Sequence, residues 1–160
     1  MGLLSAADLP VLVTGDHIRS PSTGGGLYRI LLTTDGSPAS EAALTAMGDL
    51  LPPASAQVTL LRVCEPGRDR DAVEGACRGE LEAARALMPP DLDVVPLLRQ
   101  ATAPLDVPQL ILEAASEVGA NAIAMATHGH SAMRHLFAGS IALAVLNRSE
   151  RPLILVRSRV

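Results

Sequence analysis

Lysine is absent from this chain of 160 residues, and all 13 of its basic residues are arginine. A Walker phosphate-binding loop requires the lysine of its GK[ST] motif, and Schiff-base catalysis requires a side-chain amine. Both kinds of site are therefore excluded. Arginine can still bind phosphate through its planar guanidinium group. Arg134 lies in a glycine-punctuated stretch and is a candidate for that contact, the alternative being an arginine exposed to solvent.

Aromatic residues are almost absent as well, because the chain has Tyr28, Phe137 and no tryptophan. Proteins that bind single-stranded nucleic acid usually stack its bases on aromatic rings, which this chain lacks. The formal net charge of -4 also disfavours nucleic acid and anionic membranes as partners. Apolar residues make up 48% of the chain, so we expect a globular protein with an aliphatic core.

No apolar run in the sequence is long enough to span a membrane. The N-terminus lacks the basic region of a signal peptide, and Asp8 and Pro10 interrupt its apolar residues. The two cysteines, Cys64 and Cys77, have neither metal-ligand nor CxxC spacing. We expect free thiols in a reducing compartment, which makes the cytoplasm the expected location.

The sequence divides into an N-terminal extension, residues 1–26, and one domain, residues 27–160. Within the extension, residues 9–13 are apolar and could make a short strand. Proline, serine, threonine and glycine fill residues 21–26, a composition typical of a linker. We expect the extension to be partly disordered or packed on a sheet edge.

From residue 29 onward, short apolar runs alternate with segments in which apolar residues recur at helical spacing. Ser37 is the predicted N-cap of the first helix and Asp106 that of the third. Strands separated by helices imply right-handed βαβ units and a parallel sheet with helices on both faces, an α/β fold. The predicted strands are residues 30–34, 58–63, 92–98, 122–126 and 153–156, and the predicted helices are residues 38–50, 69–88, 107–118 and 140–148.

Candidate ligand-binding residues follow the ends of these strands. In an open parallel sheet, ligands bind beyond the carboxyl ends of the strands, where the strand order reverses. Asp35, Val63 and residues 127–140 all lie at such ends. Within the last segment, Gly129 and Gly139 let backbone N–H groups approach an anion before the final helix. We interpret this segment as the phosphate-binding half of a nucleotide site.

Motifs along the chain resemble those of the universal stress protein family. Residues 126–140 resemble its signature G-x2-G-x9-G-[S/T], because Gly129 and the pair Gly139-Ser140 have the required spacing. Ala126 replaces the first glycine, and we expect its methyl group to weaken binding without abolishing it. The other matching segments are Ile30–Ser37, with its Asp-Gly-Ser turn, Leu60–Val63 and Arg151–Val156, and the resemblance covers about residues 28–158.

The resemblance implies both a fold and a ligand. The fold is a three-layer sandwich with a five-stranded parallel sheet in the order 3-2-1-4-5, of the Rossmann-like, adenine nucleotide alpha hydrolase-like type. The ligand is ATP or ADP, with Mg²⁺ or Mn²⁺ held through the phosphates. Asp35 would hydrogen-bond the ribose or adenine, and Ser140 would contact phosphate. The implied binding residues are Thr33, Thr34, Asp35, Val63, Met125, Ala126, His128, Gly129, Gly139, Ser140 and Ile141.

Several of these residues have a purely structural alternative. Asp35 could simply stabilise the turn that follows it, and Ser140 could be only a helix N-cap. The histidines at 128, 130 and 135 do not indicate a protein metal site, because no carboxylate lies within the loop. A metal ion bound through nucleotide phosphates fits better.

We expect a nucleotide-responsive regulator of stress responses rather than a dedicated enzyme, because no nucleophile-elbow pattern is present. One alternative is an interaction module of the same fold that binds no nucleotide, which Ala126 favours. The other is a weak ATPase or nucleotidyl-transferring enzyme, which only His128 and Arg134 support.

The last predicted strand, Leu153–Val156, is short and apolar and would lie at a sheet edge. An exposed edge usually recruits a partner or is protected from one. The family resemblance implies a homodimer through this strand. The alternative is that the N-terminal segment covers the edge.

Overall fold

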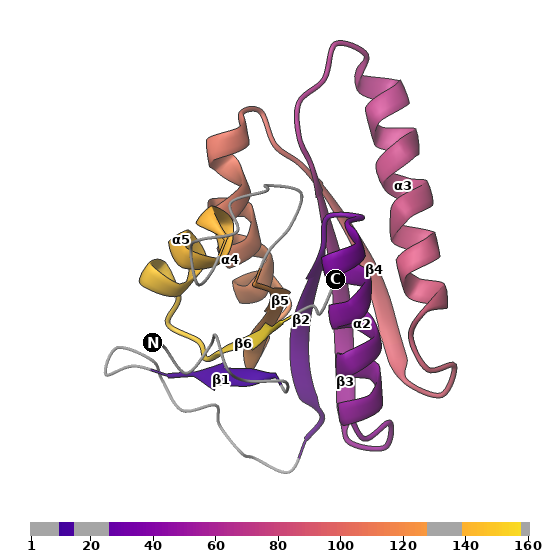
Figure 1. Cartoon of the computed structure of the whole chain (residues 1–160), viewed down its shortest axis with the longest axis vertical. Helices are drawn as coiled ribbons and strands as arrows, with labels where there is room; N and C mark the ends of the chain where they lie inside the picture. The colour runs from indigo at the N-terminus through magenta and orange to yellow at the C-terminus, as the bar shows by residue number, and fades with distance from the viewer. Residues whose placement is uncertain (1–9, 15–25, 128–138, 158–160) are drawn as a thin grey trace.

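The protein is described by a computed structural model that covers residues 10–14, 26–127 and 139–157. In the described residues, an α/β arrangement places helices on both faces of one sheet (Figure 1). The strands are β1 (Val11–Val13), β2 (Tyr28–Thr34), β3 (Ala56–Cys64), β4 (Asp93–Gln100), β5 (Ala122–Ala126) and β6 (Leu153–Val156). The helices are α2 (Pro38–Leu50), α3 (Arg70–Ala86), α4 (Val107–Glu117) and α5 (Ser140–Arg148), with a short 3-10 helix at Pro104–Asp106.

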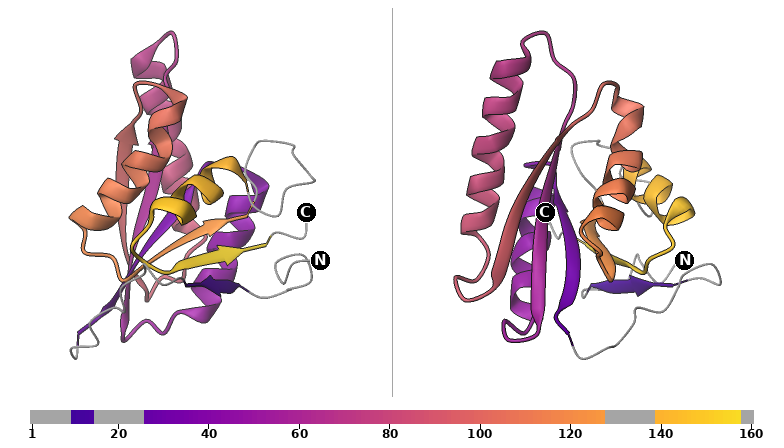
Figure 2. Two further views of the ribbon diagram at one scale, coloured as in Figure 1. Left: turned by 90° about the vertical axis from the view of Figure 1, so that its left-hand side faces the viewer. Right: turned by 180° about the vertical axis from the view of Figure 1, so that it is seen from behind.

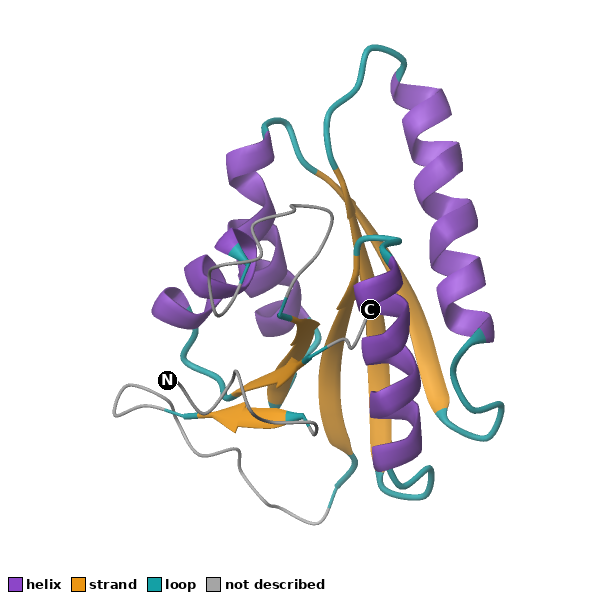
Figure 3. Ribbon diagram, in the orientation of Figure 1, coloured by secondary structure: helices purple, strands orange, loops and turns teal. Residues whose placement is uncertain are grey.

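The sheet has the strand order β1-β6-β5-β2-β3-β4. The five strands from β6 to β4 are parallel and follow the predicted order 3-2-1-4-5. The predicted count of five strands is wrong by one, because β1 adds a sixth strand that pairs antiparallel with β6. The strands and the helices that flank them are distinguished by colour in Figure 3.

Local sequence explains why the central elements form. In β2, Ile30, Leu31 and Leu32 are almost completely buried, as expected for a strand covered on both faces. The helix after it begins at a proline, and the side chain of Ser37 accepts a hydrogen bond from the Ser40 amide as predicted for an N-cap.

Two apolar clusters hold the three layers together, one on each face of the sheet. Even-numbered residues of β2, such as Ile30 and Leu32, face the cluster that includes residues of α2 and α3. The odd-numbered Leu31 faces the other cluster, to which α4 and α5 contribute. Figure 2 shows the two helix pairs on opposite sides of the strands. No helix in the described ranges is long and apolar enough to cross a membrane.

The outer edge of β6 is not free for a partner in this structure. Val11–Val13 of β1 pair with Leu153–Leu155, so a segment of the N-terminal extension occupies the edge expected to dimerise. The alternative reading of the sequence, an edge covered by the N-terminal segment, is therefore the one that the structure contains.

The expectation of two free thiols is also corrected. A disulfide joins Cys64, the last residue of β3, to Cys77 in α3. The two cysteines are 13 positions apart in sequence, too far for their spacing alone to indicate that they are in contact.

Candidate functional site

A gap in strand pairing marks the point where the sheet order reverses. The pairing of β2 with β5 ends at Leu32 and Ala124. In contrast, β2 continues beside β3 as far as Thr34, and β5 continues beside β6 as far as Ala126. The carboxyl ends of β2 and β5 are therefore unpaired with one another. This is the topological position at which open α/β sheets bind ligands.

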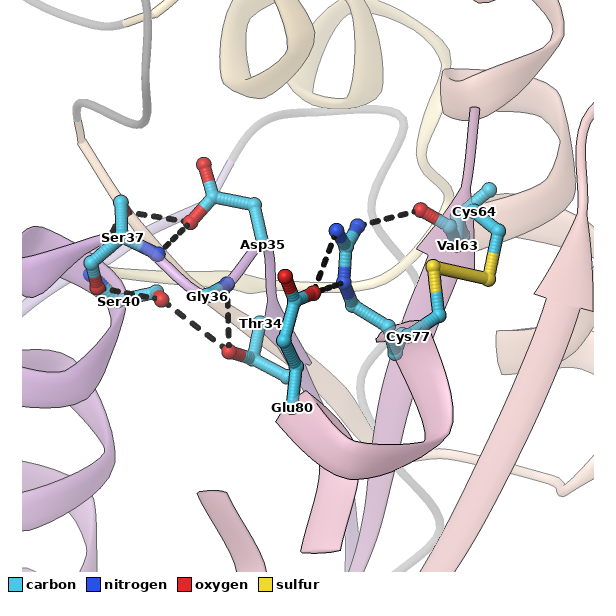
Figure 4. Close-up of polar contacts among 10 residues, drawn as sticks. Thr34, Asp35, Gly36, Ser37, Ser40, Val63, Cys64, Cys77 and Glu80 are labelled. Atoms are coloured by element: carbon cyan, nitrogen blue, oxygen red, sulfur yellow. Dashed lines mark hydrogen bonds and ion pairs between the residues drawn. A yellow bond between two sulfur atoms is a disulfide. The ribbon is translucent and has the colours of Figure 1, made fainter. Parts of the chain in front are cut away.

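One side of this gap is the turn from β2 into α2. The Asp35 carboxylate accepts hydrogen bonds from the Ser37 amide at 3.0 Å and the Ser37 hydroxyl at 2.5 Å (Figure 4). Gly36 has a φ of 76°, a conformation that glycine adopts without steric cost. The buried Thr34 hydroxyl lies 3.1 Å from that of Ser40, which ties the strand end to the helix. Asp35 thus stabilises the turn and is held in a defined position beside the gap.

The end of β3 forms the neighbouring part of the same edge. Val63 is buried and faces the α4 and α5 side of the sheet. Arg62 precedes it, and its guanidinium group donates to the Val63 carbonyl at 2.6 Å. The same guanidinium group makes an ion pair with Glu80 of α3 at 2.8 Å. The backbone at Val63 is therefore held by a side-chain network that reaches α3.

The other side of the gap is built from β5 and α5. The Gly139 amide donates a hydrogen bond to the Thr127 carbonyl, so the residues on either side of segment 128–138 are adjacent. Gly139 is the N-cap of α5, and Ser140 is its first helical residue and exposed. The alternative in which Ser140 is the N-cap of α5 is therefore wrong.

The two residues at the end of β5 face opposite layers. Met125 belongs to the apolar cluster beneath α4 and α5. Ala126 packs against the cluster on the α2 and α3 side. The methyl group that replaces the signature glycine is therefore directed away from the layer that contains α5.

The structure brings most of the predicted binding residues to one edge of the sheet. His128 and Gly129 lie outside the described residues, as does Arg134. The predicted residues that the structure places at this edge are Thr33, Thr34, Asp35, Val63, Met125, Ala126, Gly139, Ser140 and Ile141.

Sequence reasoning missed the contribution of α3. The Glu80 carboxylate covers the turn after β2, because a Cβ at Gly36 would lie 3.0 Å from its carboxylate carbon. In the sequence, Arg62 is a charged residue within an apolar predicted strand, and nothing there indicates its partner. Glu80 and Cys77 are three positions apart and so share one face of α3, but nothing in the sequence indicates what that face contacts.

Comparison with known proteins identifies similar sequences and folds. The model of the universal stress protein family matches residues 27–157. A search of curated proteins finds no match. A universal stress protein structure from Burkholderia pseudomallei is 27% identical, with a TM-score of 0.66 over 84% of this chain and 99% of its own.

Two further structures contain a nucleotide. The universal stress protein from Archaeoglobus fulgidus in complex with dAMP is 20% identical, with a TM-score of 0.63 over 81% of this chain and 97% of its own. A universal stress protein in complex with cAMP is 22% identical, with a TM-score of 0.56 over 82% of this chain and 98% of its own. At these identities, the likeness establishes the fold.

Proposed function

Because this chain belongs to the universal stress protein family, we propose that it binds ATP or ADP in the gap between the ends of β2 and β5. The observation that carries the proposal is the position of that gap, between the Asp35 turn and the first residues of α5. The dAMP and cAMP complexes of proteins with this fold support an adenine nucleotide as the ligand.

The base and ribose belong on the side of the gap nearer to β2 and β3. Val63 and Met125 offer apolar side chains at the strand ends, and both belong to the same cluster. The Asp35 carboxylate is an acceptor for a ribose hydroxyl or for the adenine amine. Thr33 extends this wall at the end of β2, whereas the buried Thr34 side chain faces Ser40 of α2 on the other side of the sheet and is not part of it.

The phosphates belong at the start of α5. The first amides of a helix have no acceptor within the helix and attract anions. Gly139 has no side chain to cap them, and its φ of -59° is open to any residue, so the backbone conformation does not require glycine there. Close approach by a ligand is a reason for glycine at this position, and Ser140 and Ile141 follow with their amides.

A divalent ion would reach the site on the phosphates. In the described ranges, no group of three or more histidine, cysteine, aspartate or glutamate side chains could hold a metal ion. The phosphate oxygens are hard ligands of the kind that Mg²⁺ and Mn²⁺ prefer, and they would supply most of the coordination. The chemistry that such an ion supplies is neutralisation of the phosphate charge.

The biological role that fits this site is regulation by nucleotide occupancy, in a cytoplasmic stress response. Backbone N–H groups that are fixed in position at the start of a helix can bind a nucleotide, but they do not supply a general base for catalysis. Homodimerisation through Leu153–Val156 is proposed only for a state in which β1 has left the β6 edge, because β1 occupies that edge here.

The experiment is nucleotide analysis of the purified protein, followed by calorimetry with Mg-ATP. We expect ATP or ADP to be released on denaturation, and Gly139→Val to weaken Mg-ATP binding by about 10-fold or more, because the branched side chain blocks the approach to α5. Gly79→Val is the matched control, since a Cβ at Gly79 in α3 would have no neighbour within 4 Å.

Three other outcomes would contradict the proposal. Absence of bound nucleotide together with no calorimetric signal would favour an interaction module, the function that Ala126 favours. Sustained multiple turnover of ATP, lost on replacing His128, would favour an enzyme. Unchanged affinity in folded Gly139→Val would place the nucleotide elsewhere.

A further inference from the structure

Helix α3 is fastened to the end of β3 by two different kinds of bond. Arg62 and Cys64 lie two positions apart and therefore face the same side of the strand. On that side, Arg62 forms its ion pair with Glu80 and Cys64 its disulfide with Cys77. Figure 4 shows Glu80 and Cys77 of α3 directed at the strand end that carries Val63 and Cys64.

The cysteine pair is placed for disulfide chemistry. The Cα atoms of Cys64 and Cys77 are 6.1 Å apart, within the range that a disulfide can bridge without backbone movement. Both side chains are buried, at 1% and 4% exposure respectively. They are also the only cysteines in the chain, so no other thiol of the same molecule competes for either partner.

The disulfide begins at the residue next to Val63, which belongs to the candidate nucleotide site. Val63 lies between Arg62 and Cys64, and both of these are anchored to α3. The Val63 carbonyl is itself held by the Arg62 guanidinium group. If α3 is held less tightly against β3, we therefore expect the backbone at Val63 to gain conformational freedom.

The same helix also reaches the Asp35 turn. Glu80 is three residues beyond Cys77, and its carboxylate covers Gly36. Besides the disulfide, the Arg62–Glu80 ion pair links α3 to this strand end, and the Glu80 side chain is 42% exposed. Ion pairs of that exposure contribute little to stability. The disulfide is thus the covalent link between α3 and the end of β3, added to the apolar packing of Leu81 and Ala84 against the sheet.

We propose that Cys64 and Cys77 form an oxidation site whose state sets the affinity for adenine nucleotide. The inference rests on the proposed function, since it concerns the same site. In the oxidised protein α3 holds Val63 and the Asp35 turn in the binding arrangement. In the dithiol protein part of the binding free energy is spent on ordering them, so the nucleotide binds more weakly.

The oxidant is a low-molecular-weight disulfide such as oxidised glutathione. The Cys77 thiolate, the more exposed of the two, attacks one sulfur of that disulfide and releases one thiol. The Cys64 thiolate then attacks the Cys77 sulfur and releases the second thiol. Each cysteine loses one proton, the protein loses two electrons, and the small disulfide is reduced to two thiols. Excess small thiol reverses both steps.

The experiment measures Mg-ATP binding by calorimetry on full-length protein treated with oxidised glutathione or with dithiothreitol. Alkylation with iodoacetamide followed by mass measurement verifies each state, since only the dithiol takes up the reagent. We expect the oxidised protein to bind at least about 5-fold more tightly. The Cys77→Ala variant should bind Mg-ATP as weakly as the reduced protein does, under both treatments. If Cys77→Ala does not fold, Cys64→Ala is measured in its place, with the same expected result.

The matched control is Arg78→Ala, which removes an exposed ion pair with Glu74 on the same helix and should keep the full redox response. Equal or weaker binding by verified disulfide protein overturns the inference and leaves the proposed function standing. Two alkylated cysteines after oxidation also overturn it. Absence of Mg-ATP binding in both states defeats the proposed function, and the inference with it.

Discussion

Asp35 stabilises the turn after β2, and the same carboxylate is the proposed contact of the nucleotide. Its carboxylate accepts two hydrogen bonds from Ser37, so the folded chain already holds it in place. A side chain that is preorganised in this way loses little conformational freedom when a ligand binds. The structural and ligand-binding readings of Asp35 are therefore compatible.

Two substitutions at Asp35 separate these roles. Asp35→Asn keeps an acceptor oxygen for Ser37 but removes the charge, so we expect the turn to persist and Mg-ATP binding to weaken by about 10-fold. Asp35→Ala also removes the acceptor and should lower the free energy of unfolding by about 1 kcal/mol. Calorimetry and denaturant unfolding check the two effects, and full affinity in Asp35→Asn would exclude an ionic role.

The Asp106 carboxylate, unlike that of Asp35, binds residues that precede it in the chain. It is the N-cap residue of α4, but its side chain makes no capping hydrogen bond to that helix. It reaches back instead to the Thr102 hydroxyl at 2.5 Å and the Ala103 amide at 2.8 Å. These bonds, that from the Thr102 side chain above all, hold the pKa of Asp106 below its ordinary value of 3.8.

The lowered pKa of Asp106 predicts an acid-sensitive contribution to stability. Because the folded value is below the unfolded one, the contribution is present above the unfolded pKa and is lost as pH falls through the folded pKa. We expect wild-type protein to be more stable than Asp106→Asn near neutral pH, with the difference shrinking below about pH 4. Denaturant unfolding across this range checks it. A difference between wild type and Asp106→Asn that stays constant across this range would contradict the prediction.

At the scale of elements, β1 decides whether β6 is a sheet edge. The ladder between them covers only three residue pairs, and Leu12 in β1 is 58% exposed. An edge strand so short adds few hydrogen bonds, each contributing about 1 kcal/mol net. Its removal would expose the backbone groups of β6, which are a template for pairing with another chain.

Deleting residues 1–14 is therefore expected to convert a monomer into a dimer that pairs through β6. Sedimentation or light scattering over a range of protein concentrations measures the change. Leu12→Ser in the intact chain is the matched control and should remain monomeric, because the backbone ladder of β1 persists. A dimer of intact protein that cross-links through Ile154 would show that β1 does not protect this edge.

At the scale of the whole molecule, the proposed nucleotide would bridge two halves of the sheet. The segment from β2 to β4 carries Asp35 and Val63, and the segment from β5 to β6 leads into and out of α5. The two halves meet along β2 and β5, where pairing stops short of the carboxyl ends. A ligand at that point contacts both halves and binds only the folded chain.

Thermal unfolding should therefore depend on nucleotide. At 100 times the dissociation constant, Mg-ATP is expected to stabilise the fold by about 2.7 kcal/mol and to raise Tm by roughly 5–10 °C. Differential scanning calorimetry measures the shift. Gly79→Val should show the same rise and Gly139→Val at most about half of it, whereas an equal rise in both variants would rule out binding at α5.

Local patterns allowed most elements to be predicted correctly. The β5 and α5 bounds agree with those expected, and Ser37 caps α2 as its position before a proline indicated. The meeting of the candidate site residues at one edge of the sheet could be predicted for the same reason, since a parallel sheet brings the ends of its strands together. The role of Glu80 could not be found, because it depends on how far α3 lies from Gly36.

The sequence by itself determined the elements and their parallel arrangement, because apolar periodicity, helix caps and right-handed connections act over short stretches of chain, and its motifs indicated the strand order through their resemblance to a family. Only the tertiary structure decided that β1 covers β6 and that Cys64 bonds to Cys77. Both are contacts between residues distant in sequence, and they form only after the helices and strands have packed.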